Sequence, residues 1–235
     1  MKISPQELAQ VAAAETPRFD LYSGIHKALR AFMADTLLAV GRMDAADEED
    51  LAQASERVLQ LLGMCGAHLA HENAFVHAAI EARAPGASER IGHEHEEHVK
   101  HIAQLAEMVA VLRGIAPQRR APAAQQLYRA LALFIADNFQ HMHVEETAHN
   151  AVLWARYTDA ELMAIEQALV ASIPPEKMMG LVRWMVPFMN PAARAAMLGG
   201  MQTHAPAPAF AAAIELVRPH LTTREWDKLA TRLGL

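Results

Sequence analysis

Two short segments of the chain each place an imidazole and a carboxylate four residues apart. The first pair is His68 and Glu72, and the second is His141 and Glu145. Four residues are about one turn of an α-helix, so the members of each pair lie one above the other on the same helical face. Imidazole nitrogens and carboxylate oxygens are both ligands for divalent cations. Two such pairs on two helices predict a single metal site.

Both pairs interrupt apolar stripes that repeat every seven residues. Steps of seven from the first pair reach Leu51, Ala54, Val58, Leu61, Cys65, Phe75, Ala79 and Ala82, and steps from the second reach Leu127, Leu131, Phe134, Asn138, Ala148, Val152 and Ala155. Such a stripe marks the buried face of a helix. Because a buried, ionised carboxylate costs several kcal/mol unless it is paired, we expect a cation between the two helices.

The composition of the 235-residue chain is typical of an all-α protein. Alanine, leucine and methionine dominate, aromatic residues make up 6%, and apolar residues do not alternate as in β-strands. The net charge of -6 and the absence of a basic cluster argue against nucleic-acid binding. No apolar run is long enough for a membrane helix or a signal peptide, and Cys65 has no partner for a disulfide. We therefore expect a soluble, cytoplasmic protein.

Helix breakers divide the first two thirds of the sequence into four long helical segments after a short leading helix from Ser4 to about Ala14. The long segments span about 20–40, 48–83, 88–114 and 122–157. Connections of a few residues force antiparallel neighbours, so we predict an up-down-up-down four-helix bundle in residues 1–157. His26 and His68 are equidistant from the first turn, and His95 and His141 from the third. These four histidines are therefore expected at one depth of the bundle.

Residues 158–235 have a different sequence pattern, in which short amphipathic helical segments are separated by prolines. Capping-box sequences start at Thr158 and at Thr222. The methionines concentrated here are expected to fill irregular core space: Met178, Met179, Met185, Met189, Met197 and Met201. We predict a C-terminal helical extension that packs on the bundle or forms an interface, including that of a homo-oligomer.

The chain resembles the hemerythrin-like, or HHE cation-binding, family over residues 20–157. The resemblance is carried by His26, His68-x3-Glu72, Glu94-His95 and His141-x3-Glu145-Glu146. It implies a four-helix bundle with a non-haem di-iron centre. It further implies that His26, His68, His95 and His141 are terminal ligands and that Glu72 and Glu145 bridge two iron ions. The spacing alone leaves zinc and manganese open.

The other histidines are expected outside this ligand set. His98 shares the inner face of its helix with His95, and it is an extra ligand, a hydrogen-bond donor to a ligand, or a replacement for His95. The remaining ones mostly fall off the predicted stripes, so they are expected to face solvent or to support ligands: His71, His77, His93, His101, His143 and His149. Substitution of His77 or His149 is expected to leave the metal content unchanged.

Two functions of different classes fit these patterns. The first is a non-haem di-iron protein that binds dioxygen or a related small oxidant, such as peroxide or nitric oxide, in oxygen or iron sensing, binding or stress response. The sequence leaves enzyme and binding protein open, although no cysteine cluster or dinucleotide loop is present to supply electrons. The alternative is a helical interaction scaffold with a structural metal such as zinc. A carboxylate-type oxygenase is disfavoured because the stripes carry no matched Glu-x2-His pairs.

Overall fold

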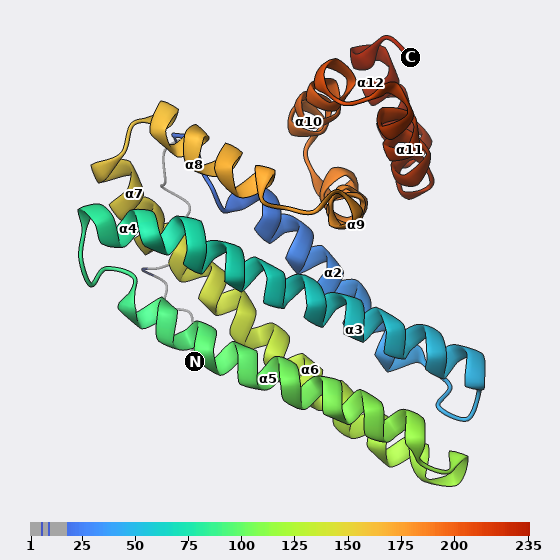
Figure 1. Ribbon diagram of the computed structural model, residues 1–235. Helices are drawn as coiled ribbons and strands as arrows, with labels where there is room; N and C mark the ends of the chain where they lie inside the picture. The colour runs from blue at the N-terminus through green and yellow to red at the C-terminus, as the bar shows by residue number, and fades with distance from the viewer. Residues whose placement is uncertain (1–5, 7–8, 10–17) are drawn as a thin grey trace.

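The computed structural model describes residues 6, 9 and 18–235 (Figure 1). Every regular element in this part of the chain is a helix, which confirms the all-α prediction. The predicted leading helix lies, apart from Gln6 and Ala9, outside the described residues.

Four long helical rods form the main body. They are α2 (Ser23–Arg42); α3 (Glu48–His71) continued by η1 (Glu72–His77) and α4 (Ala78–Arg83); α5 (Glu89–Gly114); and α6 (Pro117–Val144) continued by η2 (Glu145–His149) and α7 (Asn150–Arg156). Helices α2 and α5 each pack against both α3 and α6, so the four rods enclose one core (Figure 1). This core contains residues of the predicted apolar stripes, such as Leu61 and Leu131, together with Leu105 of α5.

One predicted helix start differs from the structure. Helix α6 begins at Pro117, five residues before the predicted start, and it continues through Pro122, although a proline in the second turn removes a backbone hydrogen bond and crowds the carbonyl four residues earlier. Helix α5 begins within one residue of its predicted start, with Ser88 in the cap position, but the Ser88 hydroxyl donates to Glu81 Oε1 at 2.6 Å instead of capping the helix.

A π-helical turn follows each site glutamate and shifts the buried face by one residue. The turns are η1, which starts at Glu72, and η2, which starts at Glu145. Within and after these turns the predicted stripe positions Ala82, Ala148 and Ala155 are exposed, whereas Val76, His77, Ile80, His149 and Leu153 are buried. The seven-residue extrapolation is therefore wrong after each glutamate, because a π turn contains an extra residue.

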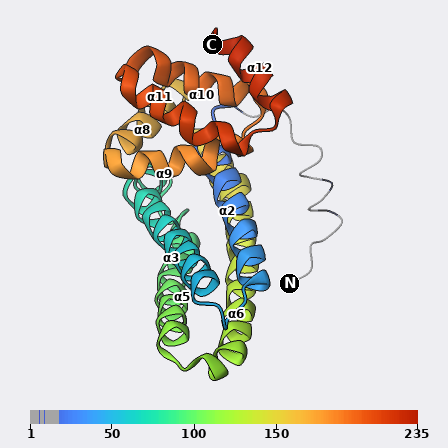
Figure 2. The same ribbon diagram turned by 90° about the vertical axis from the view of Figure 1, so that its right-hand side faces the viewer.

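The C-terminal residues form five further α-helices and two short 3₁₀ helices, which lie over one end of the bundle (Figure 2). They are α8 (Asp159–Ala171), α9 (Pro175–Met185) with the short η3 (Val186–Phe188), α10 (Pro191–His204), α11 (Ala207–Val217) with η4 (Arg218–His220), and α12 (Thr223–Leu233). Both predicted capping boxes are present, at Thr158 and at Thr222. Helices α9 to α12 share a core of their own, which includes Val182, Leu198 and Leu229.

Apolar packing at two places joins this extension to the bundle, in addition to the ion pairs Arg18–Asp159 and Arg83–Glu161. Leu162 of α8 packs with Tyr22, Val76 and Leu153 at the end of the bundle. Trp184 of α9 stacks on Phe32 of α2, with ring centroids 4.0 Å apart. The predicted domain boundary after Tyr157 and the homo-oligomer interface stay predictions.

Arg194 is the buried polar residue around which the C-terminal core is arranged. Its side chain is 2% exposed and donates to the carbonyl oxygens of Val186, Pro187 and Met189 at 2.9–3.2 Å. It also contacts Glu225 Oε1 at 3.1 Å, in the capping box of α12. One guanidinium thus connects η3, α10 and α12.

We predict that Arg194→Ala destabilises the C-terminal helices by on the order of 3 kcal/mol, because it leaves buried carbonyl oxygens without donors. Urea unfolding followed by circular dichroism measures the loss. Arg224→Ala, at an exposed position on α12, is the control. Equal unfolding midpoints for the two variants would contradict the prediction.

Candidate metal centre

The structure brings all six predicted site residues together in the core. They fall into two groups, in each of which the ligand atoms lie within 4.8 Å of one another. The His26 group consists of His26, His68, Glu72 and Glu145, and the His95 group consists of Glu72, His95, His141 and Glu145. The two groups share both carboxylates.

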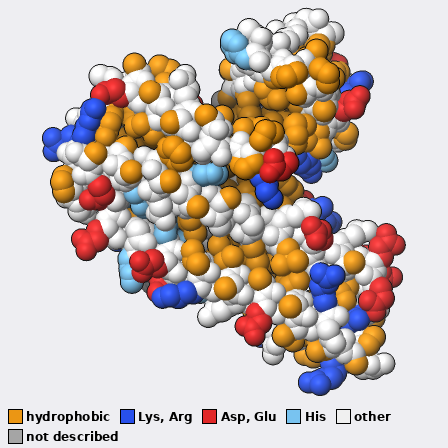
Figure 3. Space-filling view, in the orientation of Figure 1, with side chains coloured by type: hydrophobic (Ala, Val, Ile, Leu, Met, Phe, Trp, Pro, Cys, Tyr) orange, Lys and Arg blue, Asp and Glu red, His pale blue; other side chains and the backbone are white. Residues whose placement is uncertain are grey.

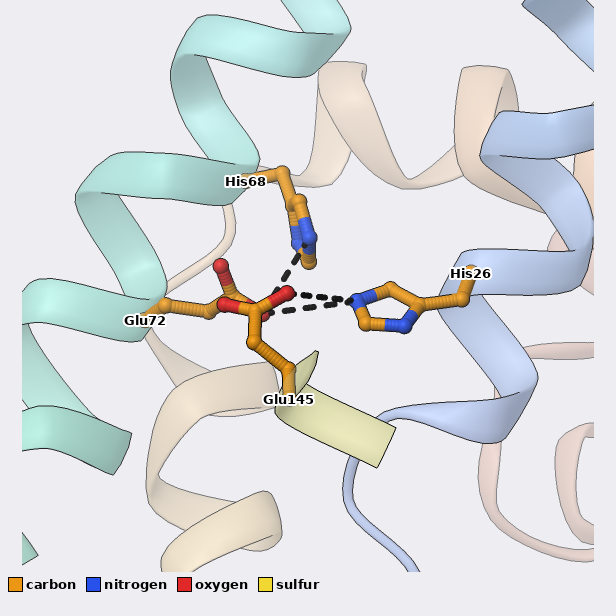
Figure 4. A group of neighbouring side chains, drawn as sticks. All are labelled: His26, His68, Glu72 and Glu145. Carbon is orange, nitrogen blue, oxygen red and sulfur yellow. Dashed lines mark ion pairs between the residues drawn. The ribbon is translucent and has the colours of Figure 1, made fainter. Parts of the chain in front are cut away.

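The His26 group is drawn in Figure 4, where two imidazoles and two carboxylates converge on one point. His26 Nε2 lies 3.5 Å from Glu72 Oε1 and 3.5 Å from Glu145 Oε2. His68 Nε2 lies 3.2 Å from Glu72 Oε1. The three helical rods α2, α3 and α6 therefore each supply part of this group.

The His95 group repeats these distances with the roles of the two carboxylates exchanged. His95 Nε2 lies 3.6 Å from Glu72 Oε2 and 3.5 Å from Glu145 Oε1. His141 Nε2 lies 3.2 Å from Glu145 Oε1. Each carboxylate consequently turns one oxygen toward the His26 group and the other toward the His95 group.

Most of the inward atoms have no hydrogen-bond partner. His26 Nε2, His68 Nε2 and all four carboxylate oxygens of Glu72 and Glu145 are buried and unpaired. Orphaned polar atoms in a protein interior are rare because each carries its desolvation cost without compensation. Six of them facing one another are the arrangement that bound cations satisfy.

Hydrogen bonds on the outer side fix the orientation of three imidazoles. The Nδ1–H groups of His26, His95 and His141 donate to Glu146 Oε1 at 3.0 Å, Asn73 Oδ1 at 2.7 Å and Glu94 Oε2 at 3.0 Å, respectively. Because these oxygens accept, Nδ1 carries the proton and each Nε2 presents a lone pair to the core. This arrangement is typical of metal-binding histidines.

The nitrogen atoms of the His95 group also have the spacing of two ligands on one ion. His95 Nε2 and His141 Nε2 lie 3.0 Å apart. Two nitrogens ~2.1 Å from one ion and at right angles are ~3.0 Å apart. Because both nitrogen atoms turn a lone pair inward, two nitrogens this close need a cation or a proton between them.

Protons take the place of cations in the metal-free cluster. Burial opposes protonation of His26, but its hydrogen bond to Glu146 and the nearby carboxylates of Glu72 and Glu145 outweigh burial and raise its pKa to about 9. Burial and the charge of Glu145 raise the pKa of Glu72. Burial opposes ionisation of Glu145 as well, yet the nearby imidazoles of His141 and His95 lower its pKa well below the usual value. The cluster therefore stores protons that a metal must displace.

A family model described as the hemerythrin HHE cation-binding domain matches residues 19–149, more than half of the chain. The chain belongs to the hemerythrin HHE cation-binding family. The matched range contains both groups and ends before α7 begins. The comparisons with curated proteins and with solved structures found no match. None of the described helices of this HHE protein has the length and apolar character needed to cross a membrane.

His98 lies beside the HHE centre but outside both groups. Its Nε2 donates to Asp137 Oδ2 at 2.9 Å, on the outer side of α6. Its ring meets that of His141 edge-on, with centroids 4.7 Å apart. The geometry shows none of the three roles considered for His98: it belongs to neither group, His95 occupies its own position in the His95 group, and the hydrogen bond of His98 goes to Asp137 and not to a ligand.

His77 and His149 are buried beside the centre, where sequence reasoning did not place ligands. Their side chains are 7% and 2% exposed, so the expectation that they face solvent is wrong, and their role in supporting ligands stays a prediction. Together with Glu145 they form a further cluster, the His149 group, with ligand atoms within 4.8 Å of one another. Burial lowers the pKa of His77 to about 4 and also lowers that of His149, so both rings are neutral. The sequence pattern that could have indicated them is a histidine four or five residues after each site glutamate.

A surface cavity of about 580 Å³ lies on the side of α5. It is lined by residues that include Asn73, Gly92, His93 and His95. Figure 3 shows histidine side chains at the surface in this region of the bundle. His95 belongs to both the cavity wall and the His95 group, so the cavity ends against one ligand of the HHE centre.

We predict that metal binding releases about one to two protons per chain at pH 7, because His26 with its pKa of about 9, and Glu72 with its raised pKa, must lose protons to act as ligands. Metal affinity should accordingly rise with pH up to about 9. Calorimetric titration with Zn²⁺ in two buffers of different ionisation enthalpy counts the protons. A binding heat that is the same in both buffers would contradict the prediction.

Proposed function

We propose that this HHE protein is a non-haem di-iron protein that binds dioxygen or a related small oxidant and acts in oxygen or iron sensing, binding or stress response. One ion would be held in the His26 group and the other in the His95 group. Glu72 and Glu145 would bridge them, and the four histidines would be terminal ligands. The bundle that carries them is proposed to have the up-down-up-down order of the family.

The observation that carries the proposal is the match between the two groups. Each has two imidazole nitrogens and one oxygen from each shared carboxylate, at distances that agree between the groups within 0.1 Å. A single structural zinc needs one closed set of four ligands. Here six residues form two sets, which supports a two-ion centre.

The donor chemistry fits iron, manganese and zinc and disfavours copper(I). Imidazole and carboxylate suit iron, manganese and zinc, whereas the thiolates that copper(I) prefers are missing from both groups. When bound, a pair of iron ions supplies redox chemistry and a coordination position for a small oxidant that six protein ligands leave open. The nearest thiol, Cys65, is inert because burial raises its pKa to about 12.

The residues around the two groups hold the ligands and keep bulk water out. Arg30 donates hydrogen bonds to both carboxylate oxygens of Glu146, at 2.6 and 3.0 Å, and Glu146 in turn accepts a hydrogen bond from His26. His26 and Glu145 are fully buried, and Tyr22 lies one helical turn from His26 as part of the apolar end layer. Such a shielded centre suits reversible binding or sensing of a small molecule.

The alternative function is a helical interaction scaffold with a structural zinc ion. The C-terminal extension with its separate core is the observation that favours it, because a second helical unit offers surface for a partner. In this alternative the metal ion would stabilise the fold, and the absorption spectrum of the protein would not change with oxygen.

We predict that the full chain, expressed with ample iron, contains about two iron ions and develops a near-ultraviolet absorption band when the reduced protein is exposed to air. Glu72→Ala and Glu145→Ala should each retain at most about one ion, because each removes a ligand from both groups. Elemental analysis with an optical spectrum of the reduced and air-exposed protein makes the measurement.

The exposed Glu96→Ala is the matched control and should keep both ions. A Glu72→Ala variant that still binds two ions would contradict the bridging role. One zinc ion per chain, with no oxygen-dependent band, would replace the di-iron proposal with the scaffold.

We predict that Gly92→Leu slows the access of small molecules to the centre several-fold without changing the metal content. A side chain at position 92 meets no atom within 4 Å of its Cβ, so the leucine extends into the cavity beside His95 without disturbing the helix. Stopped-flow mixing of iron-loaded protein with azide measures the rate. Gly63→Leu, on the exposed side of α3, is the control. Equal azide rates in the two variants would show that the cavity is not the route.

A further inference from the structure

We propose that His77, His149 and Glu145 form a third cation position, for a divalent transition-metal ion, next to the two-ion centre. The inference rests on the proposed function, because Glu145 belongs to all three groups. It assigns a binding role to two histidines that are not among the six ligands expected from the family resemblance.

The π turns bring these histidines to the centre. His77 is the last residue of η1 and His149 the last residue of η2, and each turn begins with a site glutamate. A π turn places residues five apart on one face, so the side chain of His77 returns to the side of Glu72. Both histidines thus lie in the layer next to the carboxylates, toward α4 and α7.

Both rings aim an unpartnered nitrogen into this layer. His77 Nε2 and His149 Nε2 are buried and have no hydrogen-bond partner. One ligand atom from each ring and one carboxylate oxygen of Glu145 lie within 4.8 Å of one another. Two orphaned imidazole nitrogens beside an orphaned carboxylate oxygen are a donor set for a cation, as in the two larger groups.

The orientation of both rings is fixed from outside. His149 Nδ1 lies 3.1 Å from the Tyr22 hydroxyl; when Nδ1–H donates to that oxygen, Nε2 presents its lone pair to the layer. The ring of His77 stacks on that of His95, with centroids 4.8 Å apart and an interplanar angle of 13°. His77 and His149 meet edge-on at 5.2 Å. Ring orientations held in this way are those of a built site.

The position is separate from the His95 group and is expected to be the weakest of the three. The ligand atoms of His95, His141 and Glu72 do not join those of His77 and His149 in one cluster. A third divalent ion in a core with only two carboxylates is repelled by the first two, and this repulsion is strong at low dielectric. It should therefore fill only after the other positions.

The test is equilibrium dialysis of metal-free full-length protein against increasing free Co²⁺, with bound metal measured by elemental analysis. The wild-type chain should bind about two ions tightly and about one more at a free concentration at least ~10 times higher. His77→Phe and His149→Phe, whose rings fill the same space, should saturate at about two ions with unchanged affinity for these. His93→Phe, at a 72% exposed position, is the matched control and should bind as the wild type does.

Tyr22→Phe gives a second test that leaves all ligands in place. Without the hydroxyl, the orientation of His149 is lost, so the third ion should bind several-fold more weakly while the first two are unaffected. Circular dichroism shows that each variant is folded.

Three results would overturn the inference, and they are distinguishable. Saturation of wild type and both histidine variants at two ions would remove the third position and leave the two-ion centre standing. Loss of one of the two tight ions in His77→Phe or His149→Phe would make these histidines ligands of the pair. A wild-type chain that binds no cobalt would overturn the proposed function together with the third position.

Discussion

The structure depends on two glutamates that face each other in the core of a helical bundle. Glu72 is 3% exposed and Glu145 is fully buried, and all four of their oxygens lack hydrogen-bond partners. Two carboxylates so close in a low-dielectric interior repel each other unless positive charge lies between or around them. The arrangement of neighbouring imidazoles, and of the acceptors behind them, follows from this requirement. Protons or metal ions must fill the space between the two halves.

The layer behind the ligands shows how the two halves differ despite their matched inner distances. In the His26 group, His26 donates to a carboxylate that Arg30 neutralises, whereas in the His95 group His95 donates to the neutral Asn73. A carboxylate behind a ligating imidazole makes it a stronger donor than an amide does. His141 has such a carboxylate in Glu94, which accepts from Arg90. Each half therefore contains one imidazole backed by a carboxylate that an arginine neutralises, and the His95 group differs in the neutral amide of Asn73 behind its second imidazole.

The C-terminal helices matter to the centre because of where they attach. Leu162 of α8 closes the apolar layer that contains Tyr22, and Tyr22 holds His149 through its hydroxyl. Trp184 of α9 anchors the separate C-terminal core to α2, the helix that carries His26. The extension thus contacts the surroundings of the centre through Leu162 and the helix that carries His26 through Trp184.

The sequence by itself determined the helical class, the inward faces of the helices before each glutamate, and the six residues that converge. These depend on a constant helical period, which holds from Leu51 to Glu72 and from Leu127 to Glu145, so counting along the chain was sufficient. The seven-residue repeat failed after each glutamate because the extra residue in a π turn rotates the following side chains about the helix axis. For this reason the sequence did not show that His77 and His149 are buried. Only the tertiary structure decided which outer residues hold the imidazoles, since Asn73, Glu94 and Glu146 reach across to other helices through the rotation of each rod. The same holds for Trp184, because short amphipathic helices look alike in sequence and only packing selects the partner of each.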